Sequence, residues 1–397
     1  MDSTYYRKGF GLKREIAEDL TSDYHSDLVS RVREQGHSLV VGDLTFRLAK
    51  EFGFCYGVDR AVEYAYETRR KFPDKRIFLV GEIIHNPHVN QKLEEMGINL
   101  LGYDDDGEFD FSGITADDAV LMPAFGVSVR DFERLRQIEC VVVDTTCGSV
   151  LNVWKRVERY ANSGFTALVH GKYYHEETKA TVSQVTKYEN GKYLIVRNMD
   201  EALLVCRFIE HGDNLAELRE RFARCTSPGF DFTRDLARVG VANQTTMLAG
   251  ESLAIAHRVG QALRNRYGTA VDQHFQSFDT ICSATQDRQD AVIELMKEPL
   301  DVMIVIGGYN SSNTNNLAQI CARAITTYHI SDASCIETDA GRIRHKPVGS
   351  REEGATDGWL DDGVHCIGIT AGASTPNNKI GEAIARVLET KGLAVPV

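Results

Sequence analysis

The segment VDTTC, residues 143–147, decides the fold because it combines a strand end, a short polar loop and a helix start. The apolar run at 140–143 is typical of a buried strand, and the run at 150–160 has the periodicity of an amphipathic helix. This order is the repeating unit of an α/β fold, so the segment predicts that class.

The same frame recurs elsewhere in the chain. Residues 278–282, FDTIC, again read apolar, Asp, Thr, any residue, Cys, and lead into a helical pattern. Residues 53–62, GFCYGVDRAV, form a looser third copy. We therefore expect Cys55, Cys147 and Cys282 each at the mouth of an α/β unit, where three thiols could meet at one point.

The rest of the chain supports the α/β class. Short apolar runs alternate with amphipathic helical runs, as sheets covered on both faces require. The expected strands are 77–80, 119–122, 140–143, 166–169, 193–196, 239–242, 302–306 and 366–369, with helices at 150–160 and 287–297. Residues 104–118 are expected to form a loop, and 211–235 and 345–362 to be surface excursions.

Composition restricts the class of partner and the compartment. The 397 residues are 43% hydrophobic with a net charge of -12, which argues against general nucleic-acid binding. No apolar run reaches the ~20 residues that span a bilayer, and the first residues lack the apolar core of a signal peptide. We expect a cytoplasmic protein without membrane partners, whose nine cysteines stay reduced.

The cysteine frames have two interpretations. Free cysteine is among the most buried residue types, so each could simply fill a core position. However, burial does not explain why Asp and Thr recur before Cys147 and Cys282. Polar residues there can cap the next helix and donate to sulfur, and a helix N-terminus favours a thiolate. Three thiolates suit a [4Fe–4S] cluster with one open iron, and zinc is the rival metal. The other six cysteines lack the frame and are assigned to packing or loops.

Polar residues follow several of the expected strands. His85 comes soon after one strand, and His175 with Glu177 after another. Two residues apart on an extended segment, His175 and Glu177 would face the same side and could combine anion binding with proton delivery. Alone, a histidine or glutamate near a loop is usually a solvated surface group.

Two later loops have the composition of anion sites. Residues 310–313, NSSN, follow a strand and two glycines, and residues 372–374, GAS, follow the last strand. Such residues form turns and helix N-caps, and they also hold anions at a helix N-terminus. Neither a P-loop nor a dinucleotide-binding glycine motif is present in the sequence, so a nucleotide cofactor has no support.

Together these fragments resemble one family, 4-hydroxy-3-methylbut-2-enyl diphosphate reductase, also called LytB. The resemblance runs from near Arg7 to about residue 388. Its motifs are GFCYGV (53–58), EIIHN (82–86), VDTTC (143–147), HEET (175–178), NQTT (243–246), ICSAT (281–285), NSSN (310–313) and TAGAS (370–374).

The resemblance implies a trefoil of three α/β lobes around a central iron–sulfur cluster. We expect an N-terminal extension at 1–45, a first lobe at 46–147 with Cys55, a second at 148–277 with Cys147 at its start, and a third at 278–397 with Cys282 and a C-terminal closing segment. It implies one [4Fe–4S] cluster per chain on Cys55, Cys147 and Cys282.

The family's substrate pocket maps onto polar residues of this chain. Its proton-relay carboxylate corresponds to Glu177, with Thr245 beside the substrate. Its remaining pocket residues correspond to His85, His175, Thr285, Ser311, Ser312, Asn313 and Ser374. Phe125 stands where many bacterial members have histidine, as in the longer plant and cyanobacterial branch, and Gly148 stands where proline is common.

The implied activity is reductive dehydroxylation of a C5 diphosphate, the last step of the non-mevalonate isoprenoid route. An external one-electron donor, ferredoxin or flavodoxin, is implied because the sequence has no flavin or nicotinamide motif. The alternatives are an iron–sulfur hydro-lyase, which needs no reductant, and a non-catalytic zinc-binding protein.

Overall fold

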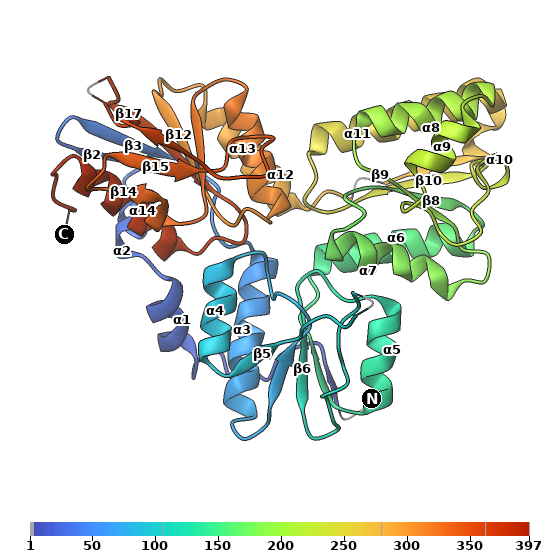
Figure 1. Cartoon of the computed structure of the whole chain (residues 1–397), viewed down its shortest axis with the longest axis horizontal. Helices are drawn as coiled ribbons and strands as arrows, with labels where there is room; N and C mark the ends of the chain where they lie inside the picture. Colours follow the sequence, from blue (N-terminus) through green and yellow to red (C-terminus); the bar gives the residue numbers. More distant parts are fainter. Residues whose placement is uncertain (1–3, 106, 279, 362, 397) are drawn as a thin grey trace. The chain divides into compact units, whose positions relative to one another are not determined.

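A computed structural model describes residues 4–105, 107–278, 280–361 and 363–396 of the chain. The chain folds into two compact units, drawn in sequence colours in Figure 1. The first unit consists of Met1–Lys8, Asp74–Gly81 and Asn99–Cys282, and the second of Gly9–Pro73, Glu82–Ile98 and Ser283–Val397.

The elements of the first unit build two sheets and their covering helices. Its strands are β1 (Tyr5–Tyr6), β4 (Ile77–Leu79), β5 (Ile98–Leu100), β6 (Ala119–Met122), β7 (Val141–Asp144), β8 (Thr166–His170), β9 (Tyr193–Val196), β10 (Val239–Asn243) and β11 (Phe275–Ser277). Its helices are α5 (Val129–Ile138), α6 (Gly148–Asn162), α7 (Glu176–Ser183), η1 (Gln184–Lys187), α8 (Met199–His211), α9 (Leu215–Arg221), α10 (Phe232–Asp235), α11 (Ala249–Tyr267) and η2 (Gly268–Gln273).

The second unit holds the remaining elements. Its strands are β2 (Ser38–Val41), β3 (Leu44–Leu48), β12 (Val302–Ile306), β13 (Thr327–Ile330), β14 (Ile336–Glu337), β15 (Arg342–His345), β16 (Gly354–Asp357) and β17 (Cys366–Ala371). Its helices are α1 (Ala17–Tyr24), α2 (Asp27–Glu34), α3 (Tyr56–Lys71), α4 (Pro87–Glu95), α12 (Ser283–Leu295), α13 (Ser312–Ala322), η3 (Ala333–Cys335) and α14 (Asn377–Thr390).

The first sheet has the order β1-β7-β6-β4-β5, and its pairs from β1 to β4 are parallel. All four residues of β6 are buried, which explains its unbroken apolar sequence. The N-terminal strand β1 lies beside β7, with Tyr5 opposite Val142. Strand β1, which lies in the predicted N-terminal extension, therefore forms the edge of the sheet whose strand β7 leads into the VDTTC loop.

The second sheet, β11-β10-β8-β9, is parallel throughout. Figure 1 shows α8 and α11 on one face and α6 and α7 on the other. Tyr160 of α6 is fully buried in its core and donates to the carbonyl oxygen of Val241 at 2.9 Å. Gly240 makes this close packing possible, because a Cβ there would lie 2.5 Å from the Tyr160 ring.

The third sheet has the order β13-β12-β17-β3-β2, parallel except for the β2–β3 hairpin. The predicted boundary between the extension and the first lobe, at residues 45–46, falls inside β3. This strand pairs with β17, far along the chain, rather than with β4. Part of the N-terminal sequence is therefore integral to the sheet of the C-terminal region.

The fourth sheet, β14-β15-β16, is antiparallel and corrects one expectation. The segment 345–362 is not merely a surface excursion, because it contributes β16 and buries Trp359 and Leu360. The Trp359 ring lies 5.6 Å from that of Tyr328 on β13. Two large apolar residues at its end make the segment part of the core.

The eight predicted strands and both predicted helices are confirmed, with ends shifted by a few residues. The α/β class with mostly parallel sheets is confirmed as well. The strands β1, β2 and β13, of two to four residues, were not predicted from the sequence. In the part of the chain that the structure describes, no helix is long and apolar enough to cross a membrane.

Replacing Trp359 by Ala tests whether 345–362 belongs to the core. Trp359 is 3% exposed, so its loss should lower the free energy of unfolding by ~3–5 kcal/mol. Val348 in the same segment is 48% exposed, and Val348→Ala is the matched control. Urea unfolding measures the free energy of unfolding of both variants. Equally small losses in the two variants would show that the segment is not part of the core.

Candidate functional site

Cys147 is the N-cap residue of α6, at the end of the loop that follows β7. Asp144 folds this loop, because its Oδ1 accepts the amide of Thr146 at 2.9 Å. Thr145 donates from Oγ1 to the carbonyl oxygen of Met122 at 2.6 Å and ties the loop to β6. The Asp and Thr of the frame therefore shape the loop, and the cysteine itself occupies the cap position that the sequence analysis gave to polar neighbours.

The carboxylate of Asp144 is held by the N-terminal strand. Its side chain is 4% exposed, accepts a hydrogen bond from Tyr5 Oη at 2.6 Å and forms an ion pair with Arg7 Nε at 3.3 Å. Burial and the Asp144 charge raise the pKa of Tyr5, so the phenol stays protonated and donates. These partners balance a buried charge that would otherwise be costly.

Cys282 ends the second copy of the frame, in the same unit. Its amide donates to the carbonyl oxygen of Thr245 at 3.3 Å. Its Sγ accepts a hydrogen bond from Ser149 Oγ at 3.2 Å. Because Ser149 lies two residues after Cys147, in the first turn of α6, this contact brings two of the three predicted ligand segments together.

In the second frame, as in the first, a threonine hydroxyl bonds the loop to a neighbouring strand. Thr280 donates from Oγ1 to Asn243 Oδ1 at 2.7 Å and accepts the Asn243 amide at 3.0 Å. Thr280 thus ties its loop to the end of β10, as Thr145 ties its loop to β6. The Asp of this frame, Asp279, lies outside the described residues.

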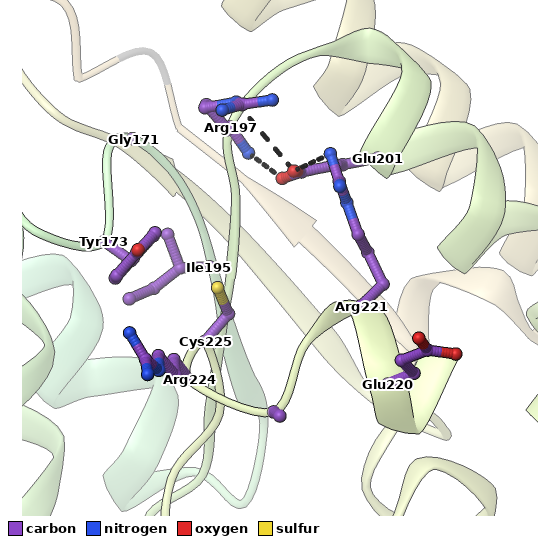
Figure 2. A pocket seen from close by; sticks show the side chains of 10 residues that line it. Gly171, Tyr173, Ile195, Arg197, Glu201, Glu220, Arg221, Arg224 and Cys225 are labelled. Carbon is purple, nitrogen blue, oxygen red and sulfur yellow. Dashed lines mark hydrogen bonds and ion pairs between the residues drawn. The ribbon is translucent and has the colours of Figure 1, made fainter. Parts of the chain in front are cut away.

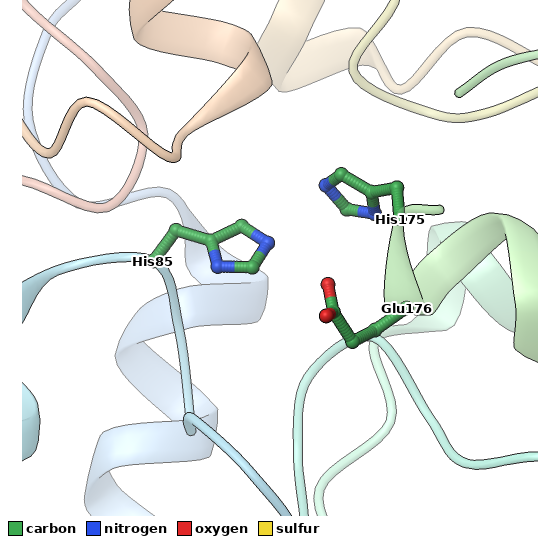
Figure 3. Close-up of side chains that lie close together, drawn as sticks. All are labelled: His85, His175 and Glu176. Carbon is green, nitrogen blue, oxygen red and sulfur yellow. The ribbon is translucent and has the colours of Figure 1, made fainter. Parts of the chain in front are cut away.

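His175 and Glu177 lie at the N-terminus of α7 and not on an extended segment, which corrects the expected geometry. Figure 3 shows His175 and its neighbour Glu176 at the start of this helix. His175 is the N-cap, and its Nδ1 accepts the amide of Glu177 at 3.2 Å. Glu177 is 1% exposed, and its Oε1 accepts the amide of Thr245 at 2.6 Å. A buried acid is therefore bonded to the residue that also holds Cys282.

Gln244 organises this region and was not singled out from the sequence, although it lies in the NQTT motif. Its Oε1 accepts the amide of Lys172 and the hydroxyl of Thr178, both at 3.1 Å. Gly171 allows the approach, because a Cβ there would lie 2.8 Å from Thr178 Oγ1. The buried amide thus joins the loop before α7 to the loop that carries Thr245.

Phe125 packs edge-on against the His175 ring, with ring centroids 5.8 Å apart at 81°. A phenyl ring cannot donate a hydrogen bond to an anion, so Phe125 contributes an apolar contact at this position. The phenyl instead restricts the orientation of the His175 imidazole.

Cys55 lies in the second unit as the N-cap of α3. Its amide donates to the carbonyl oxygen of Ala373 at 3.2 Å. Arg288 of α12 is buried and donates from Nη2 to the carbonyl oxygen of Gly53 at 2.7 Å. Arg288 was not predicted as a site residue, and its position one turn after Thr285 was the only signal that the sequence offered. Its guanidinium fixes the turn that leads into Cys55.

Several predicted anion-binding residues meet within the second unit. Ser311 is the N-cap of α13, and its Oγ accepts the amide of Thr314 at 3.3 Å. Asn313 Oδ1 accepts the amide of Ala373 at 3.0 Å, next to Ser374. Ser374 Oγ donates to the carbonyl oxygen of His85 at 3.2 Å. These loops can therefore both cap a helix and bind an anion, because the capped N-terminus of α13 is buried beside other polar groups.

The remaining donors of the second unit lie near the same loops. Ser312 and Thr285 are buried in the first turns of α13 and α12. His85 Nδ1 is 2.8 Å from Glu82 Oε2. Asn313 Nδ2 is buried without a hydrogen-bond partner among the described residues, so it is a donor suited to a ligand oxygen. Predicted site residues therefore form one set in each unit.

Similarity to known proteins identifies the family of this chain. The chain matches the family described as LytB protein over residues 46–388. The chain belongs to the LytB family. The 4-hydroxy-3-methylbut-2-enyl diphosphate reductase of Microcystis aeruginosa is 47% identical to this LytB protein over 394 residues, covering 99% of this chain and 96% of the relative. The enzyme of the same name from Gloeobacter violaceus is 46% identical, covering 98% and 93%.

Solved structures support the same assignment. A structure of (E)-4-hydroxy-3-methyl-but-2-enyl diphosphate reductase, described as the terminal enzyme of the non-mevalonate pathway, has a TM-score of 0.53 and 27% identity. The match covers 87% of this chain and 99% of that one. The corresponding reductase of Plasmodium falciparum has a TM-score of 0.62 at 22% identity and supports the fold alone. The family predicted from the motifs is confirmed.

Removing the Tyr5 hydroxyl in Tyr5→Phe should loosen the loop that leads to Cys147. A hydrogen bond to a charged group contributes ~1.5–3 kcal/mol, so amide exchange across 142–147 should accelerate about tenfold or more in Tyr5→Phe. Hydrogen–deuterium exchange measures this directly. Tyr56→Phe is the control, because Tyr56 is 81% exposed. Unchanged exchange in Tyr5→Phe would mean that Arg7 and the Thr146 amide hold Asp144 without the Tyr5 hydroxyl.

Proposed function

We propose that this LytB protein converts 4-hydroxy-3-methylbut-2-enyl diphosphate, with two electrons and two protons, into isopentenyl or dimethylallyl diphosphate and water. This is the last step of the non-mevalonate route. The hydrogen-bonded link from Glu177 through Thr245 to Cys282 carries the proposal, because it joins a buried acid to a candidate cluster ligand. A zinc-binding module would not need such an acid.

The three framed cysteines fit a cluster by their chemistry and exposure. Cys55, Cys147 and Cys282 are partly exposed free thiols, whereas five of the other six cysteines are buried. Two of them are helix N-caps, where the helix dipole favours a thiolate. We propose that they hold one [4Fe–4S] cluster, which would supply electrons one at a time and a Lewis-acidic iron for the substrate hydroxyl.

The diphosphate would be bound by neutral and imidazole donors. Ser311, Ser312 and Asn313 surround the N-terminus of α13, where backbone amides favour an anion. The Asn313 Nδ2 atom, which has no hydrogen-bond partner among the described residues, is a ready donor for a phosphate oxygen. His85, His175, Thr285 and Ser374 complete the proposed pocket. These donors allow binding of a polyanion in a protein whose net charge is -12.

Glu177 would deliver protons, with Thr245 beside the substrate. The Thr245 amide orients the Glu177 carboxyl, since it holds Oε1 at 2.6 Å. Burial of the acid and the Phe125 ring against His175 keep bulk water away from this path. Proton transfer from a positioned carboxyl then accompanies loss of the hydroxyl as water.

The electrons would come from an external one-electron donor, ferredoxin or flavodoxin. We further propose a cytoplasmic location, where the thiols stay reduced, and no nucleic-acid or membrane partner. Activity without any reductant would favour an iron–sulfur hydro-lyase instead.

Cys147→Ser tests the cluster ligands. Anaerobically purified wild-type protein should contain iron and sulfide and absorb broadly in the visible, and the variant should lose most of both. Cys366→Ser is the matched control, because Cys366 is also partly exposed but lies in β17 outside the frames. An intact spectrum in Cys147→Ser would refute this ligand, and zinc without sulfide in the wild type would refute the reductase.

Glu177→Gln tests the proton path. The variant should keep its iron and sulfide. Turnover with a chemical reductant should fall about 10²–10⁴-fold, because the glutamine amide cannot act as a proton donor in place of the carboxylic acid. Glu176→Gln changes the neighbouring carboxylate in the same helical turn and should cost far less. Near-normal turnover in Glu177→Gln would remove this residue from proton transfer.

A further inference from the structure

Ser149 is a polar residue at the start of α6 to which the proposed function gives no role. It lies two residues after Cys147, and its Oγ donates to Cys282 Sγ at 3.2 Å. The two residues of this hydrogen bond are 133 positions apart in the sequence, so the fold itself creates the contact. A hydroxyl beside one proposed cluster ligand therefore bonds to the sulfur of another.

The hydrogen bond is held in place by packing farther along α6. The guanidinium carbon of Arg156 lies 3.9 Å from the centre of the Phe278 ring, at the first residue of the second frame. The ring of Tyr160, fully buried in the core, stacks on the same phenyl with centroids 6.3 Å apart at 29°. Helix α6 thus contacts the second frame at both ends, at Phe278 and at Cys282. The position of Ser149 opposite the sulfur is set by a helix and its core contacts.

The sulfur of Cys282 lies at the N-terminus of α6. Ser149 is in the first turn of this helix, and Cys147 is its N-cap. The first amides of a helix have no partner within it, and the helix dipole favours negative charge at this end. The Ser149 hydroxyl adds a directed donor to this background. One helix end therefore favours negative charge on two of the three framed sulfurs.

Cys225 shows how a cysteine outside the frames differs. It lines a pocket of the same unit together with Ile195 and Tyr173 (Figure 2). Its Sγ has no hydrogen-bond partner in the part of the chain that the structure describes. Burial raises the pKa of Cys225 to about 11, so this thiol stays protonated near pH 7. A hydroxyl donor at the sulfur is thus not a general feature of the cysteines in this unit.

We propose that Ser149 is a positioning residue that acts through Cys282, and that its hydrogen bond raises the reduction potential of the bound cluster. The inference rests on the proposed function, because Cys282 must be a ligand. Each electron that enters adds negative charge shared by the ligand sulfurs, so a donor stabilises the reduced form more than the oxidised form. Without the hydroxyl, reduction by the external donor becomes less favourable.

The reduction potential of anaerobically purified full-length protein tests the inference. It is obtained from the EPR signal of the reduced cluster at a series of set potentials, in samples matched for iron and sulfide. In Ser149→Ala the equilibrium constant for reduction should fall by up to about tenfold, which is ~59 mV for one electron. Ser149→Thr keeps the hydroxyl and should stay near the wild-type potential.

The hydroxyl proton itself gives a second measurement. Pulsed ENDOR of the reduced cluster in H₂O and D₂O should show an exchangeable proton coupling in the wild type and in Ser149→Thr. The same coupling should be missing in Ser149→Ala. Ser163→Ala is the matched control, because it removes a hydroxyl at the C-cap of the same helix. This control should change neither the potential nor the coupling.

Four results would contradict the proposal. A wild-type potential in Ser149→Ala with its cluster intact would overturn it, as would an equal shift in Ser163→Ala. A lower potential without loss of the proton coupling would overturn the role as a donor. Loss of iron and sulfide in Ser149→Ala would assign the residue to cluster assembly and not to the potential. Absence of iron and sulfide from the wild type would instead refute the proposed function, so the two failures are distinguishable.

Discussion

The buried carboxylate of Glu177, held by the amide of Thr245 at 2.6 Å, is the interaction on which the chemistry depends. A carboxyl 1% exposed needs such a partner, because burial without hydrogen bonds is costly. The next peptide group continues the link, since the Thr245 carbonyl accepts the amide of Cys282. Acid and candidate ligand are therefore positioned by one stretch of backbone, with no flexible side chain between them.

The frames that end in Cys147 and Cys282 are similar because a threonine has the same structural role in both. A threonine in each ties its loop to the neighbouring strand, Thr145 at β6 and Thr280 at β10. In the first frame Asp144 adds an internal turn and receives Tyr5 and Arg7 from the N-terminal strand. The N-terminal segment thus has a role in shaping the site. The family match, which begins at residue 46, does not include it.

Sequence alone predicted the α/β class, the buried strands and the residues of the site motifs, because those signals are local. It could not predict that β3 pairs with β17, since a five-residue strand carries no information about its partner. The extended geometry predicted for His175 and Glu177 was also wrong. Histidine is a rare N-cap residue, so the sequence around it did not indicate the start of a helix. Gln244 and Arg288 were missed because their roles arise from contacts distant in sequence.

The central claim is that three thiolates from three segments hold one cluster and leave one iron open to the substrate. Mössbauer spectroscopy of anaerobic, ⁵⁷Fe-labelled protein tests it most directly. The account predicts that about one iron in four is distinct, without thiolate ligation, and that its signal alone changes when the C5 diphosphate is added. Four equivalent irons that do not respond to the diphosphate would contradict it.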